Sequence, residues 1–293
     1  MDTGIKGRYF YQFLALRYLL LIVVALIFAF PLVFMIVSSL KPDMQLLRDS
    51  SSLLAFVPYG DLSLDNYIGM FNRVPFGRFL FNSVFITATT TAFSILFSSL
   101  AGFSFAFLKW RGKGIVLSVI IATLIIPGET TAVPLLFVVN SLPWIGKEGL
   151  EWGWLNSIHV QIIPFIADSF SIFLFVQFFR DLPRELVEAA RMDGASWLQV
   201  YARVIMPITG PVVATVAILK FLGMWNQYLW PLMVAQSEEM RPLMLGVAYF
   251  FQLDVAWGEV MAYLSTITIP VLIFYLALQR AFIESIASSG IKG

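Results

Sequence analysis

The sequence predicts an all-α membrane protein with six transmembrane helices. Of its 293 residues, 59% are hydrophobic and only 13% are charged, and the mean hydropathy is +0.84. A soluble domain usually carries about 25% charged and about 45–50% apolar residues. The apolar residues also gather into stretches long enough to cross a bilayer, so most of the surface is expected to face lipid.

Six segments have the length and composition of a membrane span, which needs about 20 predominantly apolar residues. The third is interrupted by Pro127, Gly128 and Glu129. The fourth contains Asp168 and the fifth contains Lys220. The chain is expected to form one transmembrane domain, 1–293, with spans at about 18–40, 79–108, 115–139, 160–179, 207–235 and 260–279.

The distribution of Lys and Arg orients these spans. An even number of spans leaves both termini on one side of the membrane, and basic residues are enriched on the cytoplasmic side. The segments on the side of the termini carry Lys and Arg at about 2.5 times the density of the opposite loops. Both termini are therefore predicted to be cytoplasmic.

Composition also excludes several classes of function. The absence of cysteine excludes disulfides, thiolate metal sites and cysteine nucleophiles. The one histidine, His159, is expected to be a structural residue at a membrane edge, and no metal site is predicted. A net charge of +1 gives no field that would attract a nucleic acid, so the lipid bilayer is the partner that the composition indicates.

The segment 181–207, between the fourth and fifth predicted spans, has the pattern of a capped helical hairpin. Asp181 is expected to cap a short helix that has Pro183 in its first turn. Gly194 supplies the left-handed residue that ends this helix, and Ser196 with Gln199 forms a capping box that opens a second one. Such a hairpin suggests a docking element, and a loop that only connects two spans is the alternative. The predicted apolar face of the first helix consists of Leu182, Leu186, Ala189 and Ala190.

The same segment carries a spaced motif. Glu188-Ala189-Ala190 is followed after three residues by Gly194, and nine residues separate Gly194 from Val204-Ile205-Met206-Pro207. This pattern resembles the signature of the inner-membrane permeases of binding-protein-dependent ABC importers, which is Glu-Ala-Ala, three residues, Gly, nine residues, Ile, one residue and Leu-Pro. Val204 and Met206 replace the usual Ile and Leu with apolar residues of similar size, and the spacing is intact over 20 positions.

The resemblance implies that this segment contains a coupling helix that seats in a cleft of a cytoplasmic ATPase subunit. The residues expected to make or position that contact are Glu185, Glu188, Ala189, Ala190, Asp193, Gly194 and Pro207.

The resemblance covers nearly the whole chain and points to the carbohydrate branch of the family, the MalG-like half of a permease pair. Trp225-Asn226 and Trp230-Pro231-Leu232 stand where such proteins carry similar residues, and Gly290-Ile291-Lys292-Gly293 resembles their C-terminal tail. It implies a type I ABC importer permease fold in a bacterial or archaeal cytoplasmic (inner) membrane. The implied partners are a homologous second permease that completes a heterodimer, a dimer of cytoplasmic ATPase subunits and an extracytoplasmic solute-binding protein.

The energy source is expected to lie in another chain. No Gly-x-x-x-x-Gly-Lys-Ser/Thr phosphate loop occurs, because Gly112-Lys113 and Gly146-Lys147 lack the first glycine and the hydroxyl residue. ATP and Mg²⁺ are therefore predicted to bind to the ATPase subunit, and this chain is predicted to have no cofactor and no catalytic activity. Its expected function is to form, with the second permease, the path for a sugar, oligosaccharide or related polyol.

Sugars are recognised by hydrogen bonds to their hydroxyl groups and by stacking of ring faces on aromatic side chains. Groups of this kind stand near the outer half of the fifth span, and the candidate path residues are Trp225, Asn226, Gln227 and Tyr228. The alternative is that Trp225 and Tyr228 only anchor the span at the interface while the second permease makes the substrate contacts.

Glu129, Asp168 and Lys220 are predicted to lie at similar depths in the membrane, given a rise of about 1.5 Å per helical residue. An isolated charge at mid-bilayer costs at least about 2.5–3.5 kcal/mol. Lys220 is therefore expected to face the bundle and to pair with Asp168 or Glu129. Alternatively, Glu129 lies at the outer interface, or the charges line the sugar path.

Three other functions remain open at this stage. Glu129 and Asp168 could be the proton or sodium sites of an ion-coupled secondary transporter, although such proteins usually show internal repeats. An ABC permease for a non-sugar solute is the second alternative. A membrane enzyme acting on lipid is the third, and the sequence lacks the cluster of His, Asp, Ser or Cys that it would need.

Overall fold

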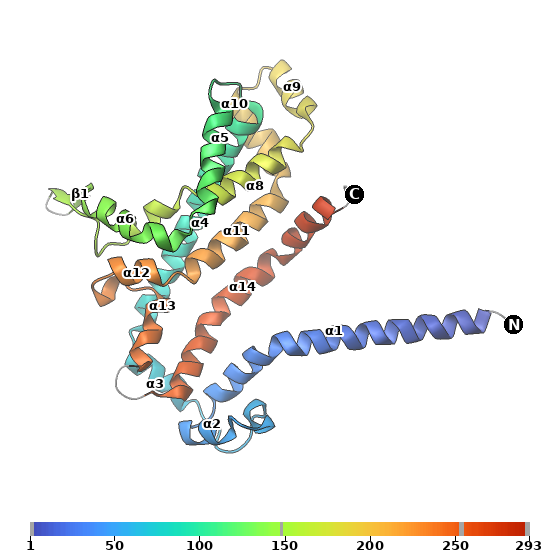
Figure 1. The fold of residues 1–293 in the computed structure, drawn as a ribbon, viewed down its shortest axis with the longest axis vertical. Helices are drawn as coiled ribbons and strands as arrows, with labels where there is room; N and C mark the ends of the chain where they lie inside the picture. Colours follow the sequence, from blue (N-terminus) through green and yellow to red (C-terminus); the bar gives the residue numbers. More distant parts are fainter. Residues whose placement is uncertain (1–2, 147–148, 252–254, 291–293) are drawn as a thin grey trace. The chain divides into compact units, whose positions relative to one another are not determined.

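The computed structural model describes residues 3–146, 149–251 and 255–290, and most of these are helical (Figure 1). Within this part, four helices are long and apolar enough to cross a membrane, and there are up to six spans if each of two bent helix pairs counts as one. The predicted helical membrane fold is thus confirmed, with two of its spans bent. The chain divides into two compact units, Met1–Val74 with Val247–Thr268 and Pro75–Gly246 with Ile269–Gly293.

The first unit begins with a long helix, α1, which contains the candidate span Phe13–Ser39. Only 6% of the most apolar stretch of that span is buried within the chain, so its surface is left for lipid or for another protein. The elements of the unit are α1 (Thr3–Ser39), α2 (Asp43–Asp49), the 3-10 turn η1 (Leu53–Phe56), α3 (Asp65–Arg73), the 3-10 turn η7 (Val247–Phe251) and the first part of α14 (Trp257–Gly290).

A buried ion pair organises the segment that follows α1. Lys41 Nζ lies 3.2 Å from Asp49 Oδ2, and both side chains are at most 2% exposed. Lys41 also donates to the carbonyl of Leu54 at 2.6 Å, and the Tyr59 hydroxyl donates to Asp49 Oδ1 at 2.9 Å. Burial raises the pKa of Asp49, but hydrogen bonds led by those from Tyr59 and Lys41 outweigh it and hold the pKa below its usual value. The carboxylate therefore stays ionised and ties α2 to η1.

The second unit is built on α4 (Phe76–Phe107), which packs against α8 (Ser169–Arg180) and α11 (Gly210–Trp225). A Cβ at Gly102 of α4 would lie 2.6 Å from Cβ of Phe175 in α8, so these helices approach more closely than a larger residue would allow. Several small hydroxyl side chains of α4 are also buried, namely Thr87, Thr90, Thr91, Ser94 and Ser98.

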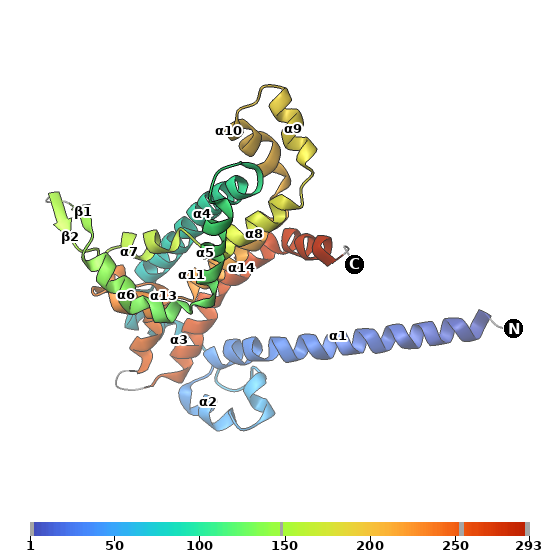
Figure 2. The same cartoon turned by 45° about the horizontal axis from the view of Figure 1, so that its top comes forward.

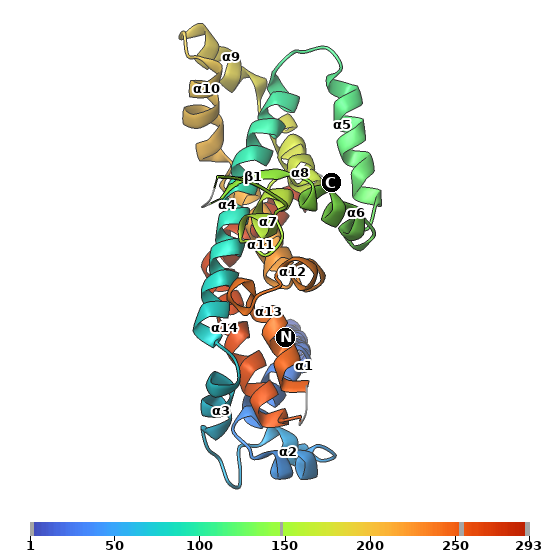
Figure 3. The same cartoon turned by 90° about the vertical axis from the view of Figure 1, so that its left-hand side faces the viewer.

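The third span breaks where the sequence predicts. Helix α5 (Lys113–Ala122) continues into the 3-10 turn η2 (Thr123–Ile125), and α6 (Gly128–Asn140) follows at a bend of 109°. Figure 3 shows this change of direction. Pro127 lies at the break in an extended conformation, which ends one helix and precedes the next.

The fifth span is not the single helix predicted over 207–235. A π-helical turn, η4 (Val200–Ile205), and a 3-10 turn, η5 (Met206–Ile208), precede α11, and the segment Trp197–Ile208 meets α11 at a bend of 81°. Helix α11 ends at Trp225, and a separate helix, α12 (Leu229–Val234), follows. Pro231 lacks the backbone N–H that a continuous helix would need at this point.

The fourth span also contains an irregular turn. Helix α7 (His159–Ile162) and the 3-10 turn η3 (Ile163–Phe165) lead to Asp168, whose carboxylate caps α8 by accepting from the backbone N–H of Ser171 at 2.9 Å. Asp168 therefore lies at the start of a helix and not within one.

The structure adds one short β-hairpin to the otherwise helical fold. Strands β1 (Pro143–Gly146) and β2 (Gly149–Trp152) pair antiparallel (Figure 2). The ring of His159 stacks on Trp144 with centroids 3.8 Å apart, so the histidine packs against the hairpin. The remaining elements are the 3-10 turn η6 (Glu238–Met240), α13 (Leu243–Gly246) and the end of α14; the tail residues 291–293 lie outside the described residues.

Candidate functional site

The loop between α8 and α11 folds as two short helices, α9 (Arg184–Met192) and α10 (Trp197–Gln199). The predicted capping of α9 by Asp181 is wrong. The backbone N–H of Asp181 donates to the carbonyl of Phe178 at 3.2 Å, so Asp181 ends α8. Pro183, with φ of −57°, precedes α9 without a side-chain cap, because its ring already fixes the backbone for a helix start.

The predicted apolar face of α9 is only partly buried within the chain. Val187 is buried, and Leu182 and Ala190 pack against the same core cluster. Leu186 and Ala189, which belong to the predicted apolar face, are exposed. The reason is the direction of the bundle, which lies on the side of Val187 and leaves Leu186 and Ala189 facing outward.

Gly194 ends α9 in the left-handed conformation that the sequence predicts, with φ of +84°. Its N–H donates to the carbonyl of Arg191 at 3.1 Å, and the N–H of Ala195 donates to that of Ala190 at 3.0 Å. These two bonds form a Schellman motif. The predicted capping box is also present and opens α10 immediately afterwards, through bonds between Ser196 and Gln199.

The acidic residues of the motif are free to meet another chain. The carboxylates of Glu185, Glu188 and Asp193 are exposed, and none has an ion-pair partner among the residues that the structure describes. The capped hairpin therefore presents a rigid backbone with unengaged charges and an exposed apolar strip, which we define as Leu186, Ala189 and Met192.

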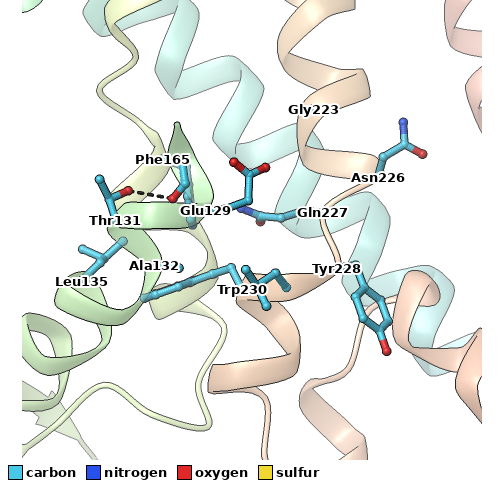
Figure 4. Close-up of a pocket in the computed structure, with 12 residues that line it drawn as sticks. Glu129, Thr131, Ala132, Leu135, Phe165, Gly223, Asn226, Gln227, Tyr228 and Trp230 are labelled. Atoms are coloured by element: carbon cyan, nitrogen blue, oxygen red, sulfur yellow. Dashed lines mark hydrogen bonds between the residues drawn. The ribbon is translucent and has the colours of Figure 1, made fainter. Parts of the chain in front are cut away.

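A second candidate site is a cavity of about 520 Å³ at the breaks of the third and fifth spans (Figure 4). This volume is in the range of small-molecule sites. The side chains of Glu129 and Gln227 lie close together in this cavity, and Tyr228 lies farther along the segment that carries Gln227 (Figure 4). The polar and aromatic residues of the lining are Glu129, Thr131, Phe165, Asn226, Gln227, Tyr228 and Trp230.

Three of the four predicted path residues line this cavity, and Trp225 does not. Trp225 is buried in the core, where its ring stacks on Phe221 with centroids 5.5 Å apart. Sequence reasoning missed Trp230, whose indole donates to the carbonyl of Val160 at 3.0 Å and presents its ring to the cavity. The Trp-Pro pair at the start of α12 is the signal that could have indicated it.

Of the three charged residues predicted within the spans, Lys220 and Asp168 form an ion pair and Glu129 lies apart from them. Lys220 Nζ lies 3.6 Å from Asp168 Oδ1, with the side chains 11% and 28% exposed. Of the two partners that the sequence left open, the structure thus places Asp168 beside Lys220. Glu129 is exposed in the cavity at the start of α6.

The ion pair adjoins the larger cavity. Asp168 and Lys220 line a smaller cavity of about 250 Å³, which shares Phe165, Gly223 and Gln227 with the larger one. Asp168 at the same time accepts hydrogen bonds from the backbone and hydroxyl of Ser171. One carboxylate therefore joins the start of α8 to the middle of α11 beside the cavities.

Comparisons with known proteins identify the family of this chain. Residues 94–287 match the family described as "Binding-protein-dependent transport system inner membrane component". The chain belongs to this family.

Two relatives align over almost their whole length. The chain is 32% identical over 277 residues to the arabinooligosaccharides transport system permease protein AraQ of Halalkalibacterium halodurans, covering 92% of this chain and 93% of the relative. It is 30% identical over 274 residues to the lactose transport system permease protein LacG of Rhizobium radiobacter, covering 93% and 94%.

A solved structure shares the fold. A chain from the crystal structure of a bacterial ABC transporter involved in the import of the acidic polysaccharide alginate superposes with a TM-score of 0.76 at 22% sequence identity. The match covers 94% of this chain and 98% of the other. The fold is therefore that of an ABC importer permease.

The ion pair gives a testable prediction. Lys220→Asp places two carboxylates together, and we expect it to lower the free energy of unfolding by on the order of 1–3 kcal/mol, less than for a fully buried pair because Asp168 is partly exposed. Adding Asp168→Lys should restore part of that loss, since the new lysine cannot cap α8. Thermal unfolding of the full chain in detergent measures both variants. A double variant no more stable than Lys220→Asp would show that the two residues are not partners.

Proposed function

We propose that this chain is one of two permease subunits of an ATP-driven importer, and that together they form the path for a sugar, oligosaccharide or related polyol. Membership of the binding-protein-dependent family supports the importer class. The names of the two relatives, which transport arabinooligosaccharides and lactose, support a carbohydrate substrate. A solute-binding protein outside the cell delivers that substrate.

The observation that carries the proposal is the capped hairpin of α9 and α10. Its backbone is fixed by the Schellman motif at Gly194, and its acidic residues and the strip Leu186, Ala189 and Met192 are exposed. These features suit a docking element for a cytoplasmic ATPase dimer. The absence of a phosphate loop from the sequence supports placing ATP and Mg²⁺ on that separate subunit.

Two further features support the assembly and its orientation. The candidate span of α1 has little of its surface buried within the chain, which leaves room for a second permease as well as lipid. The basic-residue asymmetry supports cytoplasmic termini and a cytoplasmic α9 in a bacterial or archaeal inner membrane. The path is assigned to the cavity lined by Glu129, Asn226, Gln227 and Tyr228, with the Lys220–Asp168 pair beside it.

Uptake measurements test the energy source. In proteoliposomes with the second permease, the ATPase and the binding protein, we expect uptake of a labelled oligosaccharide to need internal ATP and to persist when an uncoupler removes the proton gradient. An ion-coupled transporter would give the reverse result. ATP-dependent uptake of a solute without hydroxyl groups, in place of the sugar, would keep the importer and overturn the substrate class.

The docking role of α9 is tested by Gly194→Val. A β-branched side chain is strained at φ of +84°, by on the order of 1–3 kcal/mol, although nothing lies within 4 Å of the added Cβ. We expect the variant to lose ATPase association and uptake. Gly112→Val is the matched control, because Gly112 has φ of +83° and equally open surroundings but lies outside the motif. Equal loss of ATPase association in both variants would contradict the docking role.

The orientation is tested with single cysteines in this cysteine-free chain. Leu53 and Met192 are 85% and 86% exposed, so Leu53→Cys and Met192→Cys should react with a thiol reagent equally well wherever it has access. In intact cells a membrane-impermeant reagent should label only Leu53→Cys, and inside-out vesicles should show the opposite pattern. Labelling of Met192→Cys in intact cells would reverse the topology.

A further inference from the structure

A cavity of about 700 Å³ lies beside the capped hairpin, and Glu188 is the one residue of its lining that also belongs to the motif. One wall comes from the end of α4 and the residues after it, and the other from α9 and α10. Figure 3 shows α9 and α10 beside the end of α4 from which the chain leads into α5. The charged and aromatic lining consists of Phe107, Lys109, Trp110, Arg184, Glu188, Arg191 and Trp197.

The charge of this lining is unbalanced. It carries three cations, Lys109, Arg184 and Arg191, against the single carboxylate of Glu188. Arg191 is held in place, since its guanidinium donates to the carbonyl of Ala195 and lies 4.7 Å from the ring centre of Trp197. Lys109 and Arg184, by contrast, have no hydrogen-bond or ion-pair partner in the described part of the chain. Two free cations therefore face a cavity that is open to the outside.

Neighbouring residues strengthen the positive field. Arg180 and Arg184 both lie close enough to Lys113 for their like charges to repel. The repulsion between these cations raises the electrostatic free energy of the chain, and an anion bound among them would offset that repulsion. The cavity is thus suited to a phosphate or carboxylate.

The position of the cavity along the spans narrows the choice of anion. Lys109 follows the last residue of α4 by two positions, and Lys113 begins α5. The ends of spanning helices mark the boundary between hydrocarbon and water, where Trp110 is a typical interfacial residue. Beyond this boundary the apolar surface of α5 is exposed, with Ile115 74% and Val119 60% accessible.

We infer that this cavity binds the phosphate headgroup of an anionic phospholipid, with Lys109 and Arg184 on the phosphate and the acyl chains along α5. Basic pockets between spanning helices are known to take such headgroups. A carboxylate of the ATPase is less suited to it, because the exposed strip of α9 that would meet a partner, Leu186, Ala189 and Met192, does not line this cavity. The inference requires only that α4 and α5 span the bilayer, and it holds whether or not the chain is an importer.

Lipid binding to the full chain in detergent tests the inference. Native mass spectrometry should detect phosphatidylglycerol bound more tightly than phosphatidylcholine, which has the same acyl chains. The double variant Lys109→Gln/Arg184→Gln should weaken phosphatidylglycerol binding about 30-fold, which corresponds to about 1 kcal/mol for each cation. Arg111→Gln is the matched control, because Arg111 is exposed in the same loop but does not line the cavity, and it should bind the lipid normally.

Four results would overturn the inference. Equal binding of both phospholipids would remove the need for an anion, and equal weakening by Arg111→Gln would show a diffuse charge effect. Competition by inorganic phosphate at the same concentration as phosphatidylglycerol would indicate a site for free phosphate. Loss of ATPase association by the double variant in lipid-free detergent, with phosphatidylglycerol binding unchanged, would assign the cavity to the ATPase. Circular dichroism checks that the variants retain their helices.

Discussion

The hydrocarbon core of a bilayer supplies no water to hydrogen-bond the backbone, and this constraint governs where the chain can leave helical geometry. Within the described residues, the third, fourth and fifth spans are interrupted at Pro127, ahead of Asp168 and after Trp225. The backbone freed at these points finds local partners: Asp168 accepts from Ser171 at 2.9 Å, and the N–H of Asn226 bonds to Leu222 at 3.1 Å. Irregular backbone is tolerated at membrane depth where it lines a cavity, so the breaks and the cavity depend on each other.

Close helix packing holds this interrupted region together. In lipid, burial of apolar surface does not drive helices into contact, and small residues that let backbones approach become important. Gly102 lies so close to Phe175 that an added Cβ would be only 2.6 Å from the Cβ of Phe175. The small hydroxyl residues along α4 continue this surface of close approach. The long, unbroken α4 thereby supports α8 and α11, which are shorter and carry the ion pair.

The sequence was sufficient for most features that a local rule decides, although the predicted capping of α9 by Asp181 was wrong. The hydropathy pattern predicted the spans, the glycine and proline chemistry predicted the break at Pro127 and the left-handed Gly194, and the helical rise brought Lys220 to the depth of Asp168. The sequence was insufficient where contacts between residues far apart in the chain decided the structure. In the hairpin, Trp144 stacks on His159, and the burial of Val187 depends on which side of α9 the bundle occupies. Neither can be read from a short window of residues.

The bend of 81° between Trp197–Ile208 and α11 sets these two segments almost at right angles. Two arms set almost at right angles convert a push along one into a sideways displacement of the other. A movement of the first segment along its own axis has little component along the axis of α11, so that helix would swing and not slide. A swing displaces a point in proportion to its distance from the pivot, and Lys220 lies well along the arm, next to the path cavity.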